Sequence, residues 1–249
     1  MMHQDLRKHY LGSNTVVFTD SVHRFGTDAV LLAHFASPRL RDKTLELGTG
    51  CGIISLIWCR NGKPAQIDAL ELQDEAVDLV RLAIEENNCN DRLKVIHGDL
   101  KQVDQYCQKG SYDLVVMNPP YKKADDGVVT PIVGLAIARH EIKCDLNDIC
   151  TAAATMLNSG GRFCMCQRPA RLTDVLLAMH KAGVEPKRLR FVHQKATAVP
   201  NLFLVEGKKG ANTGLSIERP LVLETDEGEP TDERIAIYGE YYEQKERNQ

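Results

Sequence analysis

A glycine-rich stretch, Glu46-Leu47-Gly48-Thr49-Gly50-Cys51-Gly52, stands between a short strand-like run and an apolar helix start. The order strand, glycine turn, helix is typical of a parallel α/β sheet that binds a nucleotide-like ligand at the helix N-terminus. A dinucleotide fingerprint would have its third glycine where this chain has Ile53, so the cradle for a pyrophosphate is smaller. Glu46 is also a poor neighbour for phosphate. We therefore expect a ligand without phosphates that carries a cationic amino-acid or sulfonium group.

Two carboxylates follow the next two strand-like runs. Glu71 ends the run 66–71, and Asp99 follows the run 93–98. Because the carboxyl ends of parallel strands line one crevice, both side chains should lie near the glycine turn. We expect Glu71 to accept hydrogen bonds from the two hydroxyls of a ribose, and Asp99 to accept one from an adenine amino group. Each residue taken alone fits a solvated loop carboxylate better than a ligand contact.

A fourth strand-like run, Leu114–Met117, ends in Asn118-Pro119-Pro120-Tyr121. The Asn118 side-chain oxygen and the Pro119 carbonyl are two acceptors that can orient a planar amine, whose lone pair is otherwise delocalised. The prolines fix the backbone before substrate arrives, and Tyr121 offers a ring face for stacking. A simple strand stop is the alternative interpretation of Pro-Pro. The flanking Asn and Tyr favour catalysis on an exocyclic nitrogen.

The rest of the chain alternates strands and helices as one domain, with an extension over 1–40, a core over 41–210 and a second extension over 211–249. We expect an N-terminal hairpin within 9–25, then a helix that begins with Thr27 or Asp28 as its cap. Only six residues, 195–200, separate the last two core strands, so these must be antiparallel. The predicted fold is Rossmann-like, with helices on both faces of a mostly parallel seven-stranded sheet that has one antiparallel strand at its edge. The expected core strands are 43–47, 65–71, 92–97, 112–118, 162–167, 187–193 and 201–206, and the expected helices are 52–60, 74–88, 99–108, 145–158 and 169–182.

Charge is distributed unevenly, although the net charge is only −3 and the pI about 6.2. Between Arg162 and Lys209, basic residues outnumber acidic residues ten to three, whereas 224–233 contains six carboxylates and no base. A basic face partly covered by an acidic tail fits contact with RNA, and a solvated charged surface is the alternative.

The eight cysteines include no Cys-x-x-Cys pair, and the histidines are scattered. We therefore expect no metal, and we expect Cys164 and Cys166 to be small buried residues on one face of a strand. The N-terminus has no apolar targeting core, and no run approaches membrane-spanning length. The expected location is the cytoplasm, with no membrane partner and with a monomer or weak homodimer as the oligomeric state.

The glycine turn, Glu71, Asp99 and Asn118–Tyr121 together resemble a class I S-adenosylmethionine-dependent N-methyltransferase. Over nearly its whole length the chain is similar to the tRNA1(Val) adenine-37 N6-methyltransferase family. The resemblance rests on 25–32, 138–141, 168–172, 190–193 and 205–210, besides the glycine turn and Asn118–Tyr121. It implies methylation of an adenine beside a tRNA anticodon. One departure is Lys122, where an aromatic residue often follows the tyrosine, and this affects base stacking rather than the reaction.

These observations define three candidate groups of site residues. The catalytic group is Asn118, Pro119 and Tyr121. The group expected to bind S-adenosylmethionine, or S-adenosylhomocysteine as the product, is Thr27, Asp28, Glu46, Gly48, Gly50, Gly52, Glu71, Leu72, Asp99, Leu100 and Asn118. The group expected to bind tRNA is Lys122, Lys123, Arg168, Arg171, Lys208 and Lys209.

Several alternatives remain open at this point. The same motif serves methylation of a release-factor glutamine or of a guanine N2 in ribosomal RNA. A helical substrate domain, usual in the glutamine enzymes, has no room before residue 46, and a DNA adenine methyltransferase would need a target-recognition domain. A non-catalytic nucleotide-binding module, an NAD oxidoreductase and a non-enzymatic RNA-binding protein are alternatives from other classes. The first two give Asn118–Tyr121 no purpose, and turnover on any RNA would exclude the third.

Overall fold

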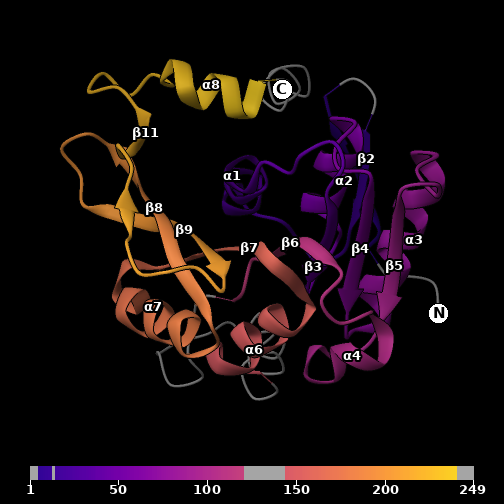
Figure 1. The fold of residues 1–249 in the computed structure, drawn as a ribbon. Coiled ribbons are helices and arrows are strands. Elements are labelled where there is room, and N and C mark those ends of the chain that lie inside the picture. Colours follow the sequence, from indigo (N-terminus) through magenta and orange to yellow (C-terminus); the bar gives the residue numbers. More distant parts are fainter. Residues whose placement is uncertain (1–4, 13–14, 121–143, 240–249) are drawn as a thin grey trace.

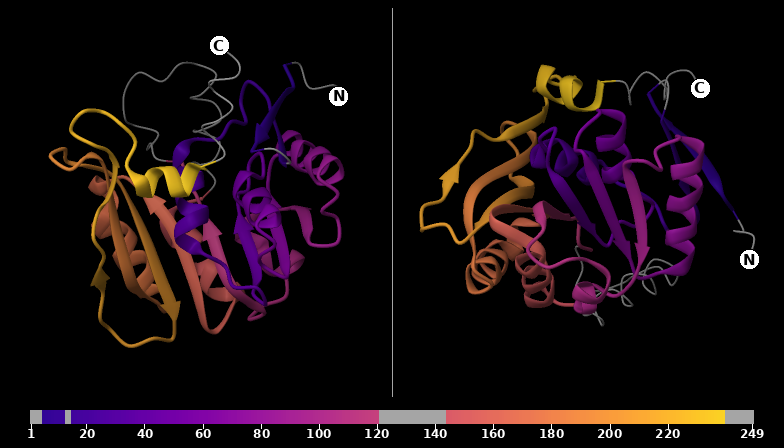
Figure 2. Two further views of the ribbon diagram at one scale, coloured as in Figure 1. Left: turned by 90° about the horizontal axis from the view of Figure 1, so that it is seen from above. Right: turned by 45° about the vertical axis from the view of Figure 1, so that its right-hand side comes forward.

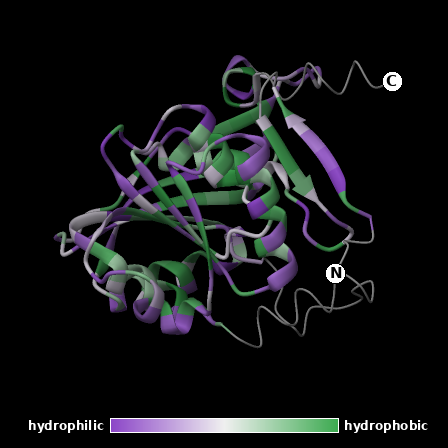
Figure 3. Ribbon diagram, turned by 90° about the vertical axis from the view of Figure 1, so that its right-hand side faces the viewer, coloured by the Kyte–Doolittle hydropathy of each residue, from purple (hydrophilic) through white to green (hydrophobic). Residues whose placement is uncertain are grey.

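The computed structural model describes residues 5–12, 15–120 and 144–239, and it contains a small hairpin and one large sheet (Figure 1). The hairpin pairs β1 (Arg7–Leu11) with β2 (Thr15–Thr19) in antiparallel register. Strand β1 is exposed except at Leu11, whereas β2 is almost wholly buried, so the hairpin has a polar outer strand and an apolar inner strand (Figure 3). The predicted N-terminal hairpin is confirmed.

The large sheet has nine strands in the order β10-β8-β9-β7-β6-β3-β4-β5, with β11 also paired to β8. The pairs β6–β3, β3–β4, β4–β5 and β6–β7 are parallel. Since β3 lies between β4 and β6, the chain leaves β3 on one side and later returns on the other, which makes the carboxyl end of β3 a topological switch point. The strands are β3 (Lys43–Leu47), β4 (Gln66–Glu71), β5 (Leu93–His97), β6 (Tyr112–Met117), β7 (Leu157–Gln167), β8 (Val184–Lys195), β9 (Pro200–Lys209), β10 (Ser216–Ile217) and β11 (Leu221–Glu224).

Helices cover both faces of the sheet, because alternate side chains of the central strands are buried on opposite sides. On β6, Leu114 and Val116 join a core with α1, α2 and α3, while Val115 and Met117 join a second core with α4, α6 and α7. The predicted fold class is confirmed. The helices are α1 (Thr27–Ala36), α2 (Ile53–Arg60), α3 (Asp74–Glu86), α4 (Val103–Tyr106), α6 (Leu146–Met156), α7 (Leu172–Lys181) and α8 (Asp232–Tyr238), with 3-10 turns η1 (Leu100–Gln102) and η2 (Pro169–Arg171).

The reversed strand does not lie at the sheet edge as expected: β9 is antiparallel to both β7 and β8 and lies between them. The short connection requires the β8–β9 pair to be antiparallel but does not decide which strand is outside. Composition explains the outcome, because Leu202–Val205 of β9 is buried on both faces, whereas β8 carries Lys187, Arg188 and Arg190. The two strands beyond the predicted seven, β10 and β11, come from the C-terminal extension.

Two element boundaries also differ from expectation. Strand β7 begins at Leu157 instead of at residue 162, so Gly160 and Gly161 lie within the strand and not in a turn before it. Helix α1 begins at Thr27 with Gly26 as its cap, and neither Thr27 nor Asp28 caps it. The Asp28 side chain has another partner, described below.

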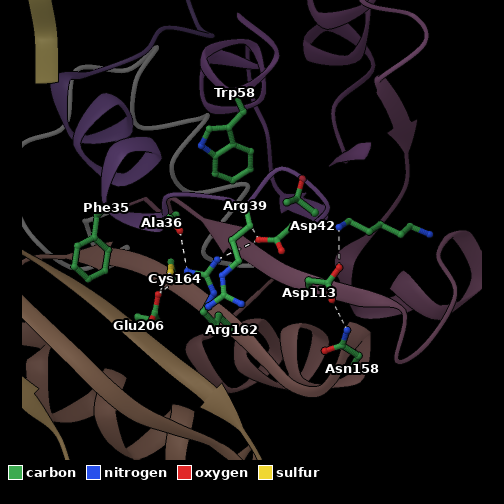
Figure 4. A network of polar contacts seen from close by, with 12 residues as sticks. Phe35, Ala36, Arg39, Asp42, Trp58, Asp113, Asn158, Arg162, Cys164 and Glu206 are labelled. Carbon is green, nitrogen blue, oxygen red and sulfur yellow. Dashed lines mark hydrogen bonds and ion pairs between the residues drawn. The ribbon is translucent and has the colours of Figure 1, made fainter. Parts of the chain in front are cut away.

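An ion network lies away from the carboxyl ends of the parallel strands. It surrounds Arg162, at the start of the β7–β9 pairing (Figure 4). The Arg162 guanidinium contacts Glu206 of β9 at 3.0 Å, Asp42 ahead of β3 at 3.2 Å and the Ala36 carbonyl at the end of α1 at 3.0 Å. Arg188 reaches the same Glu206 oxygen at 3.1 Å. The network therefore fixes the reversed strand against both α1 and the strand that carries the glycine turn.

The C-terminal segment returns to the beginning of α1. Helix α8 lies across α1 (Figure 2), and the Tyr238 hydroxyl donates to the Thr27 carbonyl at 3.1 Å. Farther back along the same segment, Glu233 forms an ion pair with Arg190 of β8. The extension thus contacts the core through β10, β11 and α8.

Candidate active site

The glycine turn follows β3 directly and leads into α2. Gly48, Gly50 and Gly52 have φ of 64°, 57° and 80°, a left-handed backbone that strains any residue with a side chain. At Gly52 a Cβ would also approach Val80 to 3.1 Å, so helix α3 packs closely beneath the turn. The predicted order of strand, glycine turn and helix is confirmed.

Glu71, at the end of β4, is almost completely buried beside this turn. One carboxylate oxygen accepts from the Gly50 backbone N–H at 2.8 Å, and the other accepts from Leu72 at 2.8 Å and Gln73 at 3.0 Å. A carboxylate has about four acceptor positions, so these bonds leave about one for a ligand hydroxyl. Glu71 therefore organises the turn as well as facing the crevice.

Asp99 lies on the neighbouring strand end, after β5. Its side chain accepts from the Lys101 backbone N–H at 2.9 Å and caps the 3-10 turn η1. Asp99 and Glu71 line one recess with Gly48, Leu72 and Leu100, so five of the predicted cofactor residues lie together. Leu70, Gly98, Met117 and Cys144 complete its lining. The sequence analysis selected neither Gly98 nor Cys144. The structure gives a reason for glycine at position 98, since a Cβ there would overlap the Tyr106 ring.

Glu46 does not line this recess. It is buried under the turn, where its carboxylate accepts from the Ser55 backbone N–H at 3.1 Å and from the Ser55 hydroxyl. Burial away from water raises the pKa of this carboxyl to about 7, despite the hydrogen bonds from Ser55 that lower it. The side chain is thus bound to the first turn of α2, while the sequence suggested a partner for a cationic ligand group.

Asn118 follows β6, and its amide lies between two side chains from other elements. Its Nδ2 donates to Asp28 Oδ2 at 3.0 Å, and its Oδ1 accepts from the Cys166 thiol at 3.0 Å. Cys166 is on β7 at the position beside Asn118, because Met117 pairs with Met165 in the parallel register. Cys164 and Cys166 are fully buried, as predicted. Pro119 is buried as well, and Tyr121 lies outside the described residues.

Of the basic residues predicted to bind RNA, the four that the structure describes lie in two separate places. Arg168 is at the carboxyl end of β7, where it donates to the Asn201 carbonyl at 2.8 Å, and Arg171 pairs with Asp174. Lys208 and Lys209 end β9, roughly 23 Å farther along that strand from Asn201. The Lys209 ammonium donates to the Leu157 carbonyl at 2.7 Å. Lys122, Lys123 and the stretch 138–141 fall outside the described residues.

The described part of the chain offers no metal site and no membrane-spanning helix. Residues 5–12, 15–120 and 144–239 contain no cluster of three His, Cys, Asp or Glu side chains that could hold a metal ion. None of the described helices has both the length and the apolar character needed to cross a membrane. The eight cysteines all carry free thiols.

This fold and strand-end site define a class I methyltransferase architecture. A profile of the methyltransferase small domain family matches residues 10–182, and the chain belongs to this family. A tRNA1(Val) (adenine(37)-N6)-methyltransferase of Tolumonas auensis is 30% identical over 223 residues, covering 88% of this chain and 90% of the relative. A relative with the same name from Phocaeicola vulgatus is 27% identical over 228 residues, covering 92% and 94%.

Solved structures agree on the fold. A predicted O-methyltransferase from Agrobacterium tumefaciens superposes with a TM-score of 0.68 at 21% identity, covering 86% of this chain and 96% of the other. A tRNA m1G37 methyltransferase of M. jannaschii gives a TM-score of 0.58 at 16% identity, covering 84% and 58%. At these identities the likeness concerns the fold alone.

Proposed function

We propose that this protein transfers a methyl group from S-adenosylmethionine to the exocyclic N6 of an adenine in tRNA, at the position beside the anticodon. The observation that carries the proposal is the strand-end position of the Asn118 amide, beside a recess lined by glycine and two carboxylates. The names of the relatives that match over most of their length favour an adenine in tRNA over a glutamine or a ribosomal guanine.

The lining of the recess suits a nucleoside. Glu71 and Asp99 supply acceptors for hydroxyl and amino groups, and Leu72, Leu100 and Met117 supply apolar surface for a planar base. S-adenosylmethionine, when bound, would supply an electrophilic methyl group on a sulfonium. The residues that would hold its nucleoside part are those of the recess, whereas Glu46 would act indirectly, by stabilising the turn.

Asn118 would act on the nucleophile. Its Oδ1, which also accepts from the Cys166 thiol, has two lone pairs and would accept from one N–H of the adenine amine, which orients the nitrogen lone pair. The Pro119 carbonyl would accept from the other N–H. Acceptor dipoles fixed in advance stabilise the positive charge that develops on the nitrogen during methyl transfer. The methylated nitrogen is cationic and strongly acidic, so its proton leaves to a nearby acceptor or to water, and no strong base is required. The adenine must leave its stack to reach this point, which costs least for a loop base.

For the RNA, we propose contacts from Arg168 and Arg171 at the Asn118 end of the sheet and from Lys208 and Lys209 at the far end. An extended RNA could contact both ends, since phosphate contacts do not depend on sequence. We further propose that the protein acts in the cytoplasm and as a monomer or weak homodimer.

The direct test compares nucleosides from total tRNA of cells with and without the gene. Loss of N6-methyladenosine on deletion, restored by the wild-type gene and not by an Asn118→Ala gene, is the expected result. Unchanged N6-methyladenosine, together with loss of a different methylated nucleoside, would assign another acceptor to the same site.

A further inference from the structure

The two ends of the Asn118 amide have different partners. Nδ2 donates to the Asp28 carboxylate across 90 residues of sequence, and Oδ1 accepts from Cys166. Asp28 lies in the first turn of α1, whose cap residue is Gly26, and it is half-buried. Its carboxylate is directed at the proposed catalytic amide.

The hydrogen bond between Asp28 and Asn118 can form in only one orientation of the amide. An ionised carboxylate only accepts hydrogen bonds, so it can contact only the NH₂ end of an amide. A flip of Asn118 by 180° would place Oδ1 against Asp28, where the two acceptors repel. We propose that Asp28 is a positioning residue that keeps the Asn118 oxygen available for the substrate amine. This inference rests on the proposed function of Asn118.

The contact also affects how well Asn118 accepts. Donation from an amide NH₂ to a carboxylate draws electron density towards the amide oxygen, and hydrogen bonds in such a chain strengthen one another inside a protein. A stronger dipole at Oδ1 is useful where positive charge develops on the attacked nitrogen. Asp28 thus raises the acceptor strength of Asn118 without touching the substrate.

Gly26 keeps the carboxylate in this position. A Cβ built at residue 26 would overlap Asp28 Oδ1, so any larger residue there must displace the Asp28 side chain. The backbone of Gly26 is extended, with φ of −107°, which any residue can adopt. The requirement for glycine at this position is therefore space for the carboxylate.

The first test is Asp28→Asn, which keeps the shape of the side chain but can face either end of the Asn118 amide. We expect kcat to fall at least about twofold, because molecules whose Asn118 presents NH₂ to the substrate do not turn over and a neutral partner no longer polarises the amide, with the Kd for S-adenosylhomocysteine unchanged. Asp78→Asn, on the exposed face of α3, is the matched control and should retain full activity. A raised Kd with unchanged kcat would make Asp28 a cofactor ligand and overturn the proposal.

An exchange of the two residues gives a stricter test. Asn118→Asp alone brings two carboxylates together and should abolish turnover. The double variant Asp28→Asn with Asn118→Asp restores one donor and one acceptor, so we expect its kcat to exceed that of Asn118→Asp by about tenfold or more. Equal activity of the single and double variants would contradict the positioning role, since loss of structure alone predicts no rescue.

A spectroscopic measurement separates this inference from the proposed function. In wild-type protein, one side-chain amide proton of Asn118 should be shifted downfield by the Asp28 carboxylate in a ¹⁵N–¹H correlation spectrum, and Asp28→Asn should remove the shift. This readout needs no RNA. If wild-type protein methylates no RNA but shows the shift, the proposed function fails while the contact stands; absence of the shift refutes the contact itself.

Discussion

Glu71 Oε2 accepts the backbone N–H of Gly50 at 2.8 Å, which joins the end of β4 to the glycine turn after β3. The other oxygen of the same carboxylate accepts from Leu72 and Gln73. One buried side chain therefore holds two neighbouring strand ends in a fixed relation. Both strand ends contribute to the recess that would hold the nucleoside part of the cofactor.

Replacement of Glu71 by Gln should weaken cofactor binding. A Gln amide has one NH₂ end, which would face either the Gly50 N–H or the Leu72 and Gln73 N–H groups, so a buried donor would lose its acceptor. We expect a loss of about 1–3 kcal/mol in the binding free energy of S-adenosylhomocysteine, measured by titration calorimetry. Glu85→Gln, an exposed change on α3, is the control. Wild-type affinity in Glu71→Gln would show that the turn forms without this carboxylate.

Glu46 should make the stability of the protein depend on pH. Its pKa in the folded state is about 7, above the value near 4.5 of the free side chain, so the folded state binds a proton more tightly between these values. The contribution of Glu46 is complete below about pH 4.5 and falls as the pH rises to about 7, by about 3 kcal/mol. In urea unfolding, Glu46→Gln should therefore gain stability relative to wild type over this interval. Parallel pH curves for the two proteins would refute the assignment.

Loss of Arg162 should destabilise the fold without changing the chemistry. Arg162→Met leaves the partly buried carboxylates of Asp42 and Glu206 without this cation, at a cost of about 3–5 kcal/mol in the free energy of unfolding. Chemical denaturation measures the loss, and Arg81→Met on the surface of α3 is the control. Because the network lies at the opposite end of the sheet from Asn118, kcat per folded molecule should stay near the wild-type value.

Asn118→Ala should abolish turnover and leave cofactor binding unchanged. Methyl transfer should fall by orders of magnitude, because the substrate amine loses a fixed acceptor where charge develops. The Kd for S-adenosylhomocysteine should remain near the wild-type value, since the recess is lined by other residues. Filter-binding and single-turnover assays on the same preparations would measure both quantities. A comparable loss of both would contradict a role restricted to the reaction.

The salt dependence of tRNA binding can distinguish the contributions of the two groups of basic residues. Charge reversal at Lys208 and Lys209 should reduce the slope of log K for tRNA binding against log salt by about one for each phosphate that the variant no longer neutralises. Reversal at Arg168 and Arg171 should do the same. An unchanged slope for the lysine pair, measured beside a reduced slope for the arginine pair, would confine the RNA to the Asn118 end of the sheet.

Local features of the site were predictable because they depend on residues close together in sequence. The glycine turn needs three glycines with left-handed backbone, and the carboxylates at 71 and 99 each follow an apolar run. The contact between Asp28 and Asn118 was not predictable in this way. From sequence alone Asp28 looks like a helix cap or a cofactor ligand, and only the packing of α1 against β7, the neighbour of β6, brings it to the amide.

The position of β9 shows a similar limit. The short connection after β8 establishes that the two strands run in opposite directions, and this could be predicted. Which of them is buried depends on comparing their side chains: Leu202–Val205 has no charged residue, whereas β8 alternates basic and apolar residues. Glu46 is a further case, since its burial against Ser55 depends on how α2 leaves the turn.

The short strands β10 and β11 have a consequence for how the molecule behaves in a crowded solution. They cover the outer side of β8 in two pieces, two and four residues long, and Pro220 between them has no N–H to donate. A strand of a second molecule that approached this edge of the sheet, formed by β10 and β11, would meet an interrupted row of backbone donors and acceptors. Such an edge discourages aggregation through strand addition, which a long, continuous border strand would invite.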